Sequence, residues 1–168
     1  MATLDIAFED PWKDEIRSVD LAVAALDSAA AIVPVLANER LLISILFTGD
    51  DEVRTLNREW RGKDRSTNVL SFPMLDEADL AHLEPQGAPV MLGDIALAHG
   101  TCVREAAEKN IPVDDHCAHL IIHGLLHLVG LDHETGDRDA EEMEAIERRA
   151  LAKMGIADPY ADRDQTGA

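Results

Sequence analysis

The segment HGLLHLVGLDH, residues 123–133, constrains the fold of this chain more than any other stretch. His123 and His127 are four residues apart, so on an α-helix their imidazoles lie on one face, one turn apart. Gly130 follows at a position where helices often end in a left-handed residue, a conformation that glycine adopts at low cost. The chain then turns back and brings His133 towards the same point. We therefore predict a central helix whose end carries three converging imidazoles.

Three neutral imidazole nitrogens with a fourth position open are typical of a catalytic zinc site, whereas a structural zinc has four protein ligands. The spacing HxxxHxxGxxH is that of the zinc-protease signature HExxHxxGxxH, except that Gly124 stands at the position of the glutamate. We predict one Zn²⁺ per chain, with His123, His127 and His133 as its ligands.

Two further polar residues are candidates for supporting the zinc site from behind its ligands. His119 lies one turn before His123, and it either contacts a ligand or is a buried histidine with its own hydrogen bond. Asp132 either orients a ligand imidazole or caps the turn. His116 lies ~10 Å from His123 along the helix axis, at ~1.5 Å per residue, which is too far to share the metal.

Length and composition indicate one domain without membrane segments. A chain of 168 residues with 46% hydrophobic content is enough for a single core, which we assign to residues 1–155, with 156–168 as a flexible tail. No apolar run approaches the roughly 20 residues that cross a bilayer, and the start of the chain lacks the pattern of a signal peptide. We expect a cytoplasmic protein with no membrane contact, in which Cys102 and Cys117 are buried thiols.

The pattern of hydrophobic residues predicts an α+β fold: a small mixed sheet of about four strands, covered by about five helices, with the zinc site at the end of the central helix. The expected strands are 4–8, 40–49, 68–74 and 91–98. The expected helices are 15–31, 51–61, 99–109, 115–129 and 138–154. We expect Asp50 and either Asp114 or Asp115 to be N-caps, Gly62 to end the second helix, and 75–90 to be a surface loop.

The charge distribution has one basic exception in an acidic chain. The net charge of −18 argues against a surface that binds nucleic acid everywhere. Within residues 54–65, however, five basic residues face two acidic ones, a local balance of +3. The basic residues are Arg54, Arg58, Arg61, Lys63 and Arg65. This segment is either a binding surface for a polyanion or a solvated helix end with its own salt bridges.

The glycine at position 124 matters for the reaction. In HExxH proteases the glutamate takes a proton from the zinc-bound water and passes it to the departing amine, and Gly124 has no side chain to do this. Cleavage of a phosphodiester depends as much on a cation near the phosphoryl oxygens. Zinc lowers the pKa of bound water to about 7, and the planar fork of an arginine such as Arg61 suits a phosphate.

Three segments, in this order, resemble the YbeY family of bacterial rRNA-maturation endoribonucleases: LNREWRGKDRSTNVLSFP (56–73), LGDIALA (92–98) and HLIIHGLLHLVGLDHE (119–134). The resemblance covers about residues 40–154, and AEEMEAIERRAL resembles the last helix of the family. It implies a single-domain α+β fold, a zinc held by three histidines and cleavage of single-stranded RNA. It also implies a role in 16S rRNA 3′-end maturation and ribosome quality control, with the small ribosomal subunit and an associated GTPase as partners.

Carried over by position, His123, His127 and His133 match the metal ligands of the family, and Arg61 matches its catalytic arginine. The residues expected to guide the RNA backbone are Arg58, Lys63 and Arg65. Ser71 and Asp94 either line the cleft or serve in turns, and Trp60 and Phe72 either stack on bases or, as we expect, pack in the core.

Two alternatives to a zinc-dependent endoribonuclease remain open at this point. One is a zinc peptidase or amidase that has recruited another base, such as Glu134. The other is a non-catalytic ribosome-assembly factor in which the metal is structural.

Overall fold

A mixed sheet of four strands forms the middle of the structure, a computed structural model that describes residues 1–12, 14–131 and 137–161. The strands are β1 (Thr3–Phe8), β2 (Leu41–Thr48), β3 (Val69–Pro73) and β4 (Val90–Ala98), in the order β1-β2-β4-β3. β2 pairs in parallel with both β1 and β4, whereas β3 pairs antiparallel with β4 and forms one edge. The expected α+β fold with a small mixed sheet is therefore confirmed.

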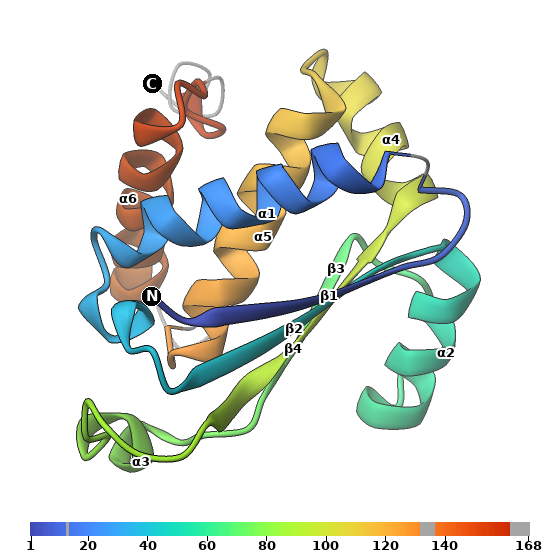
Figure 1. Ribbon diagram of the computed structural model, residues 1–168. Helices are drawn as coiled ribbons and strands as arrows, with labels where there is room; N and C mark the ends of the chain where they lie inside the picture. Colours follow the sequence, from blue (N-terminus) through green and yellow to red (C-terminus); the bar gives the residue numbers. More distant parts are fainter. Residues whose placement is uncertain (13, 132–136, 162–168) are drawn as a thin grey trace.

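The two faces of the sheet are covered unequally (Figure 1). One face carries α1 (Glu15–Ala30), α4 (His99–Lys109), α5 (Val113–Leu128) and α6 (Asp137–Lys153). The other face carries α2 (Asp50–Arg61) at one end. The short α3 (Glu77–Ala81) lies beyond the strand ends, between β3 and β4, and its Leu80 packs against the main hydrophobic core. The 3-10 helix η1 (Pro34–Ala37) links α1 to β2. Part of the second face is therefore not covered by any helix of the described chain.

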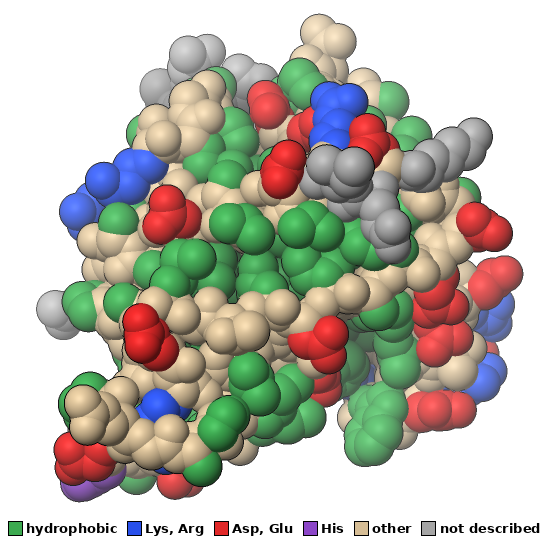
Figure 2. All heavy atoms as spheres, in the orientation of Figure 1, with side chains coloured by type: hydrophobic (Ala, Val, Ile, Leu, Met, Phe, Trp, Pro, Cys, Tyr) green, Lys and Arg blue, Asp and Glu red, His purple; other side chains and the backbone are tan. Residues whose placement is uncertain are grey.

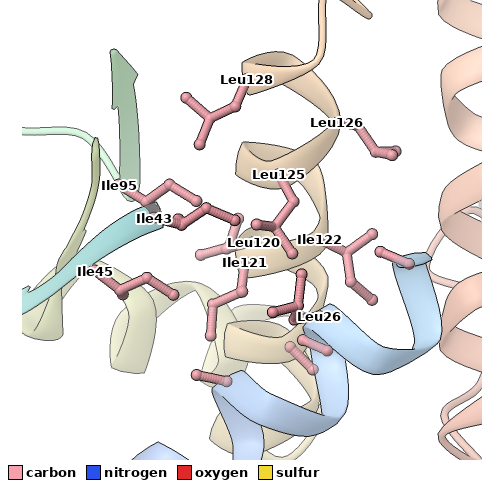
Figure 3. Close-up of a cluster of buried hydrophobic side chains, with 14 of the residues drawn as sticks. Leu26, Ile43, Ile45, Ile95, Leu120, Ile121, Ile122, Leu125, Leu126 and Leu128 are labelled. Carbon is pink, nitrogen blue, oxygen red and sulfur yellow. The ribbon is translucent and has the colours of Figure 1, made fainter. Parts of the chain in front are cut away.

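Helix α5 is the centre of the hydrophobic core. Ile121, Leu125 and Leu128 point towards the strands that carry Ile43, Ile45 and Ile95, whereas Ile122 and Leu126 point to the opposite side (Figure 3). All of these side chains are buried, so α5 is apolar around most of its circumference. Burying each such side chain stabilises the fold by about 1.5–3 kcal/mol, which makes α5 a rigid platform for the polar residues it carries.

A smaller cluster lies on the other face, beneath α2, and consists of Val53, Leu70, Ala96 and Ala98 with Leu46, Leu56 and Phe72 packed against it. The two cysteines, Cys102 and Cys117, are buried thiols, as expected. Among the described residues, no helix is both long and apolar enough to span a bilayer.

Both glycines expected at helix ends have the left-handed conformation. Gly62 has φ 70° and ends α2, and Gly130 has φ 96° just after α5. The Gly130 N–H donates to the His127 carbonyl (3.1 Å) and the Leu131 N–H to the Leu126 carbonyl (3.0 Å), so the chain turns sharply away from the helix axis.

Three local expectations were wrong. α2 is preceded by Gly49, not capped by Asp50; the Asp50 carboxylate instead accepts hydrogen bonds from the Thr101 N–H (3.0 Å) and hydroxyl (3.1 Å) in the first turn of α4. α5 begins after Pro112, so Asp114 and Asp115 lie in its first turn, where their charges suit the helix dipole. The expected loop 75–90 contains α3, which begins with a capping box.

Gly93 provides a test of how closely β3, β4 and α5 pack. A Cβ at this position would lie 2.5 Å from the Phe72 carbonyl oxygen and 2.6 Å from Leu128 Cδ2. We expect Gly93→Ala to lower the free energy of unfolding by about 3 kcal/mol, because backbone must move to make room. Gly62→Ala is the matched control: nothing lies within 4 Å of its Cβ, so only the positive φ is penalised, by about 1 kcal/mol. Urea denaturation measures both, and equal losses would contradict this account.

Candidate metal centre and its cavity

A cavity of about 380 Å³ lies where the edge strand β3 meets α5. His123 and His127 of α5 and Ser71 of β3 line it, and Arg61, the last residue of α2, reaches it from the other side of the strand. Two of the three segments that carry the family resemblance, 56–73 and 119–134, are thus brought to one place. Most of the exposed lining is polar, which suits a charged ligand.

The ring of His123 is held from behind by a buried carboxylate. Its Nδ1 lies 2.7 Å from Oε1 of Glu147, a residue of α6. A neutral imidazole that donates from Nδ1 has its lone pair on Nε2. The contact with Glu147 therefore selects the tautomer in which Nε2 is the ligand nitrogen, an arrangement that metal-binding histidines generally have.

His127 is held in the same way by a hydroxyl group. Its Nδ1 lies 2.5 Å from Oγ of Ser71, across the contact between α5 and β3. Both rings thus contact the protein through Nδ1, so Nε2 is the candidate coordinating nitrogen of each; the Ser71 hydroxyl donates to or accepts from Nδ1 of His127 according to the tautomer of that ring. Ser71 was expected either to line the cleft or to serve in a turn, and the structure places it in the cavity wall.

Glu147 is fully buried, and three hydrogen-bonding side chains surround its carboxylate. Besides His123, these are His119, whose Nε2 lies 3.2 Å from Oε2, and Tyr160, whose hydroxyl donates to Oε2. Burial raises the pKa of the Glu147 carboxyl, but the hydrogen bonds from His119, His123 and Tyr160 outweigh this effect and bring the pKa down to about 2. The carboxylate therefore stays ionised near neutral pH and acts as an acceptor.

Glu147 was not recognised in the sequence, although a signal for it exists. Met143, Ala150 and Leu151 are buried on one face of α6, and Glu147 occupies the same face at helical spacing. A glutamate on the apolar face of a helix needs buried partners, and such partners are commonly histidines or other donors.

The other two histidines of α5 differ in their relation to the cavity. His119 is buried with hydrogen bonds of its own, to Glu147 and to Tyr160 (3.1 Å), and the shared carboxylate links it to His123, a predicted ligand. His116 pairs instead with Glu105 of α4, at 2.8 Å. Burial lowers the pKa of His116, so it is neutral and donates to that carboxylate.

The basic segment divides into two groups. Arg61 lines the cavity, together with Lys109 from the end of α4, which the sequence did not single out. Arg54 pairs with Asp64 at 2.8 Å, and Arg58 lies 3.9 Å from the same carboxylate on the exposed side of α2. Lys63 and Arg65 are exposed and do not line the cavity, so the structure brings Arg61 to it without the other predicted RNA-binding residues.

The third predicted ligand, His133, lies outside the described residues, and so do Asp132 and Glu134. Within residues 1–12, 14–131 and 137–161, no three His, Cys, Asp or Glu side chains converge as a metal site. The donor chemistry of the described part nevertheless fits zinc, because two imidazoles at i and i+4 each have an oxygen partner on Nδ1.

Position 124 explains why a glutamate is missing from the histidine motif. Gly124 is buried, and a Cβ there would lie 3.0 Å from Cδ1 and 3.3 Å from Cγ1 of Ile95 in β4. The position therefore faces the core between α5 and the sheet and not the cavity. A glutamate at this place in this fold would point at Ile95, where it could not act on a bound water.

We therefore expect Gly124→Glu to destabilise the protein by about 3 kcal/mol or more, because it buries a charge without a partner. Gly124→Ala is the comparison: the end of the Ile95 side chain can shift by a few tenths of an ångström, so we expect a change within about 1 kcal/mol. Urea denaturation of both variants measures the difference. A Gly124→Glu protein as stable as the parent would show that position 124 is not confined to the core.

Comparison with known proteins identifies the class to which this arrangement belongs. The family model described as Endoribonuclease YbeY matches residues 10–155, and the chain belongs to this family. Curated relatives named Endoribonuclease YbeY include that of Novosphingobium aromaticivorans, 54% identical over 96% of this chain and 97% of the relative. The relative from Erythrobacter litoralis is 64% identical over 77% of this chain and 81% of its own length.

Among solved structures, the solution structure of TM1509 from Thermotoga maritima matches with a TM-score of 0.60. It is 22% identical in sequence and the match covers 96% of this chain and 93% of that chain. At this identity the likeness supports the fold alone. The resemblance expected from the histidine and arginine motifs is confirmed by the family model.

Proposed function

We propose that the protein is a zinc-dependent endoribonuclease that cleaves single-stranded RNA. The observation that supports the proposal is the shared cavity: Arg61 from α2 lines the same cavity as His123 and His127 from α5. A cation held by imidazoles and an arginine beside it form the pair of positive groups that phosphodiester cleavage requires. Membership of the endoribonuclease YbeY family supports the same conclusion.

His123, His127 and His133 would hold one Zn²⁺, the first two through Nε2. When bound, the zinc supplies a Lewis acid for a phosphoryl oxygen. Arg61 binds a second oxygen of the same phosphate through its planar fork and orients the scissile bond. Ser71 and Glu147 hold the two rings through Nδ1, so that Nε2 of each would be directed at the zinc.

The described residues do not favour a peptidase. The position of the protease glutamate faces the core at Gly124, and Glu147 accepts hydrogen bonds from His119, His123 and Tyr160 behind the ligand ring. Neither group is available to move a proton between water and a leaving amine. A phosphodiester substrate makes less demand on such a group, because charge stabilisation dominates its cleavage.

The biological setting we propose is 16S rRNA 3′-end maturation and ribosome quality control in the cytoplasm. The support is family membership together with a cavity that suits a phosphate. On this proposal the partners are single-stranded rRNA, the small ribosomal subunit and a ribosome-associated GTPase.

The proposal is tested with labelled single-stranded RNA and with casein, using protein purified without a histidine tag. We expect the parent to cleave RNA but not casein, and His127→Ala to lose both zinc and RNA cleavage. Arg61→Ala should retain zinc and lose about 100-fold or more in kcat, because the phosphate loses a positive group near its developing charge.

Arg58→Ala is the matched control, since Arg58 lies one turn earlier on α2 near Asp64. We expect its kcat to equal that of the parent. Cleavage of casein by the parent would favour the peptidase alternative. Zinc binding without cleavage of either substrate would favour a metal-containing assembly factor.

A separate prediction concerns Glu147 and zinc affinity. Glu147→Gln replaces a carboxylate that accepts through both oxygens with an amide that accepts through one and donates through the other, so it no longer accepts from His123, His119 and Tyr160 together and holds the Nδ1 proton of His123 less firmly. We expect the Kd for Zn²⁺ to rise about 10- to 100-fold, as measured by competition with a chelating dye. The ¹⁵N shifts of the His123 ring should report the change of tautomer directly.

The chain contains a matched control in Glu105, which contacts His116 on the same helix at 2.8 Å but outside the predicted ligand set. Glu105→Gln should leave the Kd for Zn²⁺ unchanged. If both variants lost zinc affinity equally, a general loss of stability would explain the result and the specific role of Glu147 would be refuted.

A further inference from the structure

A second, apolar hollow of about 660 Å³ lies on the sheet face that the larger helices leave uncovered. It is bordered by the end of α2 and by the segment that follows β3. Figure 2 shows the hollow beneath the sheet next to α2, with hydrophobic side chains on both of its sides. Arg61 and Ser71 line both this hollow and the cavity that contains His123 and His127, here called the metal cavity, so the two spaces meet at the β3 edge.

The floor of the hollow has a polar row beside an apolar one. The strand register places Asp5 beside Ser44 and Ser44 beside Asp94, on three neighbouring strands. All three side chains line the hollow and are at least partly exposed. The next row along the strands consists of Ala7, Leu46 and Ala96, which are apolar. A flat apolar ligand with hydrogen-bond donors on one edge would fit such a floor.

Trp60 forms one wall of the hollow, and its side chain is not used by the core. The sequence led us to expect core packing for Trp60, because it recurs with Val53 and Leu56 at helical spacing. The residue is instead 72% exposed, whereas Val53 is fully buried. Phe72 and Met74 of the opposite wall are also accessible, Met74 to 54%. Exposed apolar groups gathered around one hollow are typical of a binding site.

We propose that this hollow is a subsite for one unpaired nucleobase of the RNA strand. The inference rests on the proposed function, because Arg61 would hold a phosphate at the junction of the two spaces. Trp60 directly precedes Arg61 in the chain, so a strand whose phosphate lies at Arg61 has a neighbouring base within reach of the indole. Stacking of that base on Trp60 anchors the strand beside the metal cavity.

Charge decides what part of a nucleotide enters the hollow. Asp5 and Asp94 repel a phosphate, so the backbone stays at Arg61 and only the uncharged base enters. The same carboxylates accept hydrogen bonds from an exocyclic amino group. Cytosine presents an exocyclic amino group with two N–H donors where uracil presents a carbonyl oxygen, and the donor on that side of uracil is the single N3–H of the ring. The subsite therefore favours cytosine over uracil, two rings of the same size.

The test measures binding of eight-nucleotide 2′-O-methyl oligonucleotides, which are checked on a gel for intactness. The chain has two tryptophans, and the indole N–H of Trp12 donates to the Thr48 carbonyl (2.7 Å), away from the hollow. We expect oligocytidine to quench the tryptophan fluorescence of the parent. The Trp60→Phe variant contains only Trp12, and its fluorescence should not change. Oligocytidine should bind the parent more tightly than oligouridine.

A double-mutant cycle assigns the contact. Removing one base at a time from the oligocytidine should weaken binding to the parent roughly 5- to 100-fold at one position, the loss expected for one stacked base. Trp60→Ala should bind the intact oligonucleotide equally weakly and show no further loss at that position. Val23→Ala, which changes an exposed apolar residue on α1, is the matched control and should behave as the parent.

The outcomes separate this inference from the proposed function. A parent that cleaves RNA while Trp60→Ala binds with parental affinity would overturn the nucleobase subsite and leave the hollow to a protein partner. Equal binding of oligocytidine and oligouridine would overturn the role of the carboxylates. A parent that neither binds nor cleaves RNA would overturn the proposed function and the subsite with it.

Discussion

The close contact between α5 and β4 determines where every polar group of the site lies. Gly124 allows the helix to approach Ile95 so closely that a methyl group would already touch it. With that face of α5 fixed on the sheet, His123 and His127 are directed to the β3 edge, where Ser71 meets the second ring. The same packing turns into the core the position at which HExxH zinc proteases carry their base, so the glycine limits the chemistry open to the site as well as its geometry.

The site also depends on the buried carboxylate of Glu147, whose charge is tolerated in the core because both oxygens are hydrogen-bonded. A buried carboxylate without partners would destabilise the fold by several kcal/mol. Glu147 avoids this because His119, His123 and Tyr160 all hydrogen-bond to it, drawing α5, α6 and the segment after α6 to one point. The contacts that hold the ring of His123, a predicted zinc ligand, are therefore also the contacts that hold α6 against α5.

The sequence predicted the elements whose signals are local. The helical spacing of His123 and His127, the left-handed Gly62 and Gly130, and the four strands all follow from short patterns. It failed where the partner of a residue is distant in the sequence: Asp50 accepts hydrogen bonds from the first turn of α4 and not from its own helix, and Glu147 pairs with His123, 24 residues away. Trp60 fits a core pattern, but α2 covers too little of the sheet to bury it. The third predicted ligand, His133, lies outside the described residues and stays a prediction.

The contact between Tyr160 and Glu147 has a consequence for how the site comes into being. Synthesis runs from the N-terminus, so His123 leaves the ribosome before Glu147 and Tyr160, whereas Ser71, the partner of His127, precedes both histidines. Until α6 has been made, the ring of His123 lacks the carboxylate that keeps its proton on Nδ1. The predicted zinc ligand His123 thus gains its orienting partners only after α6 and the segment that carries Tyr160 have been made.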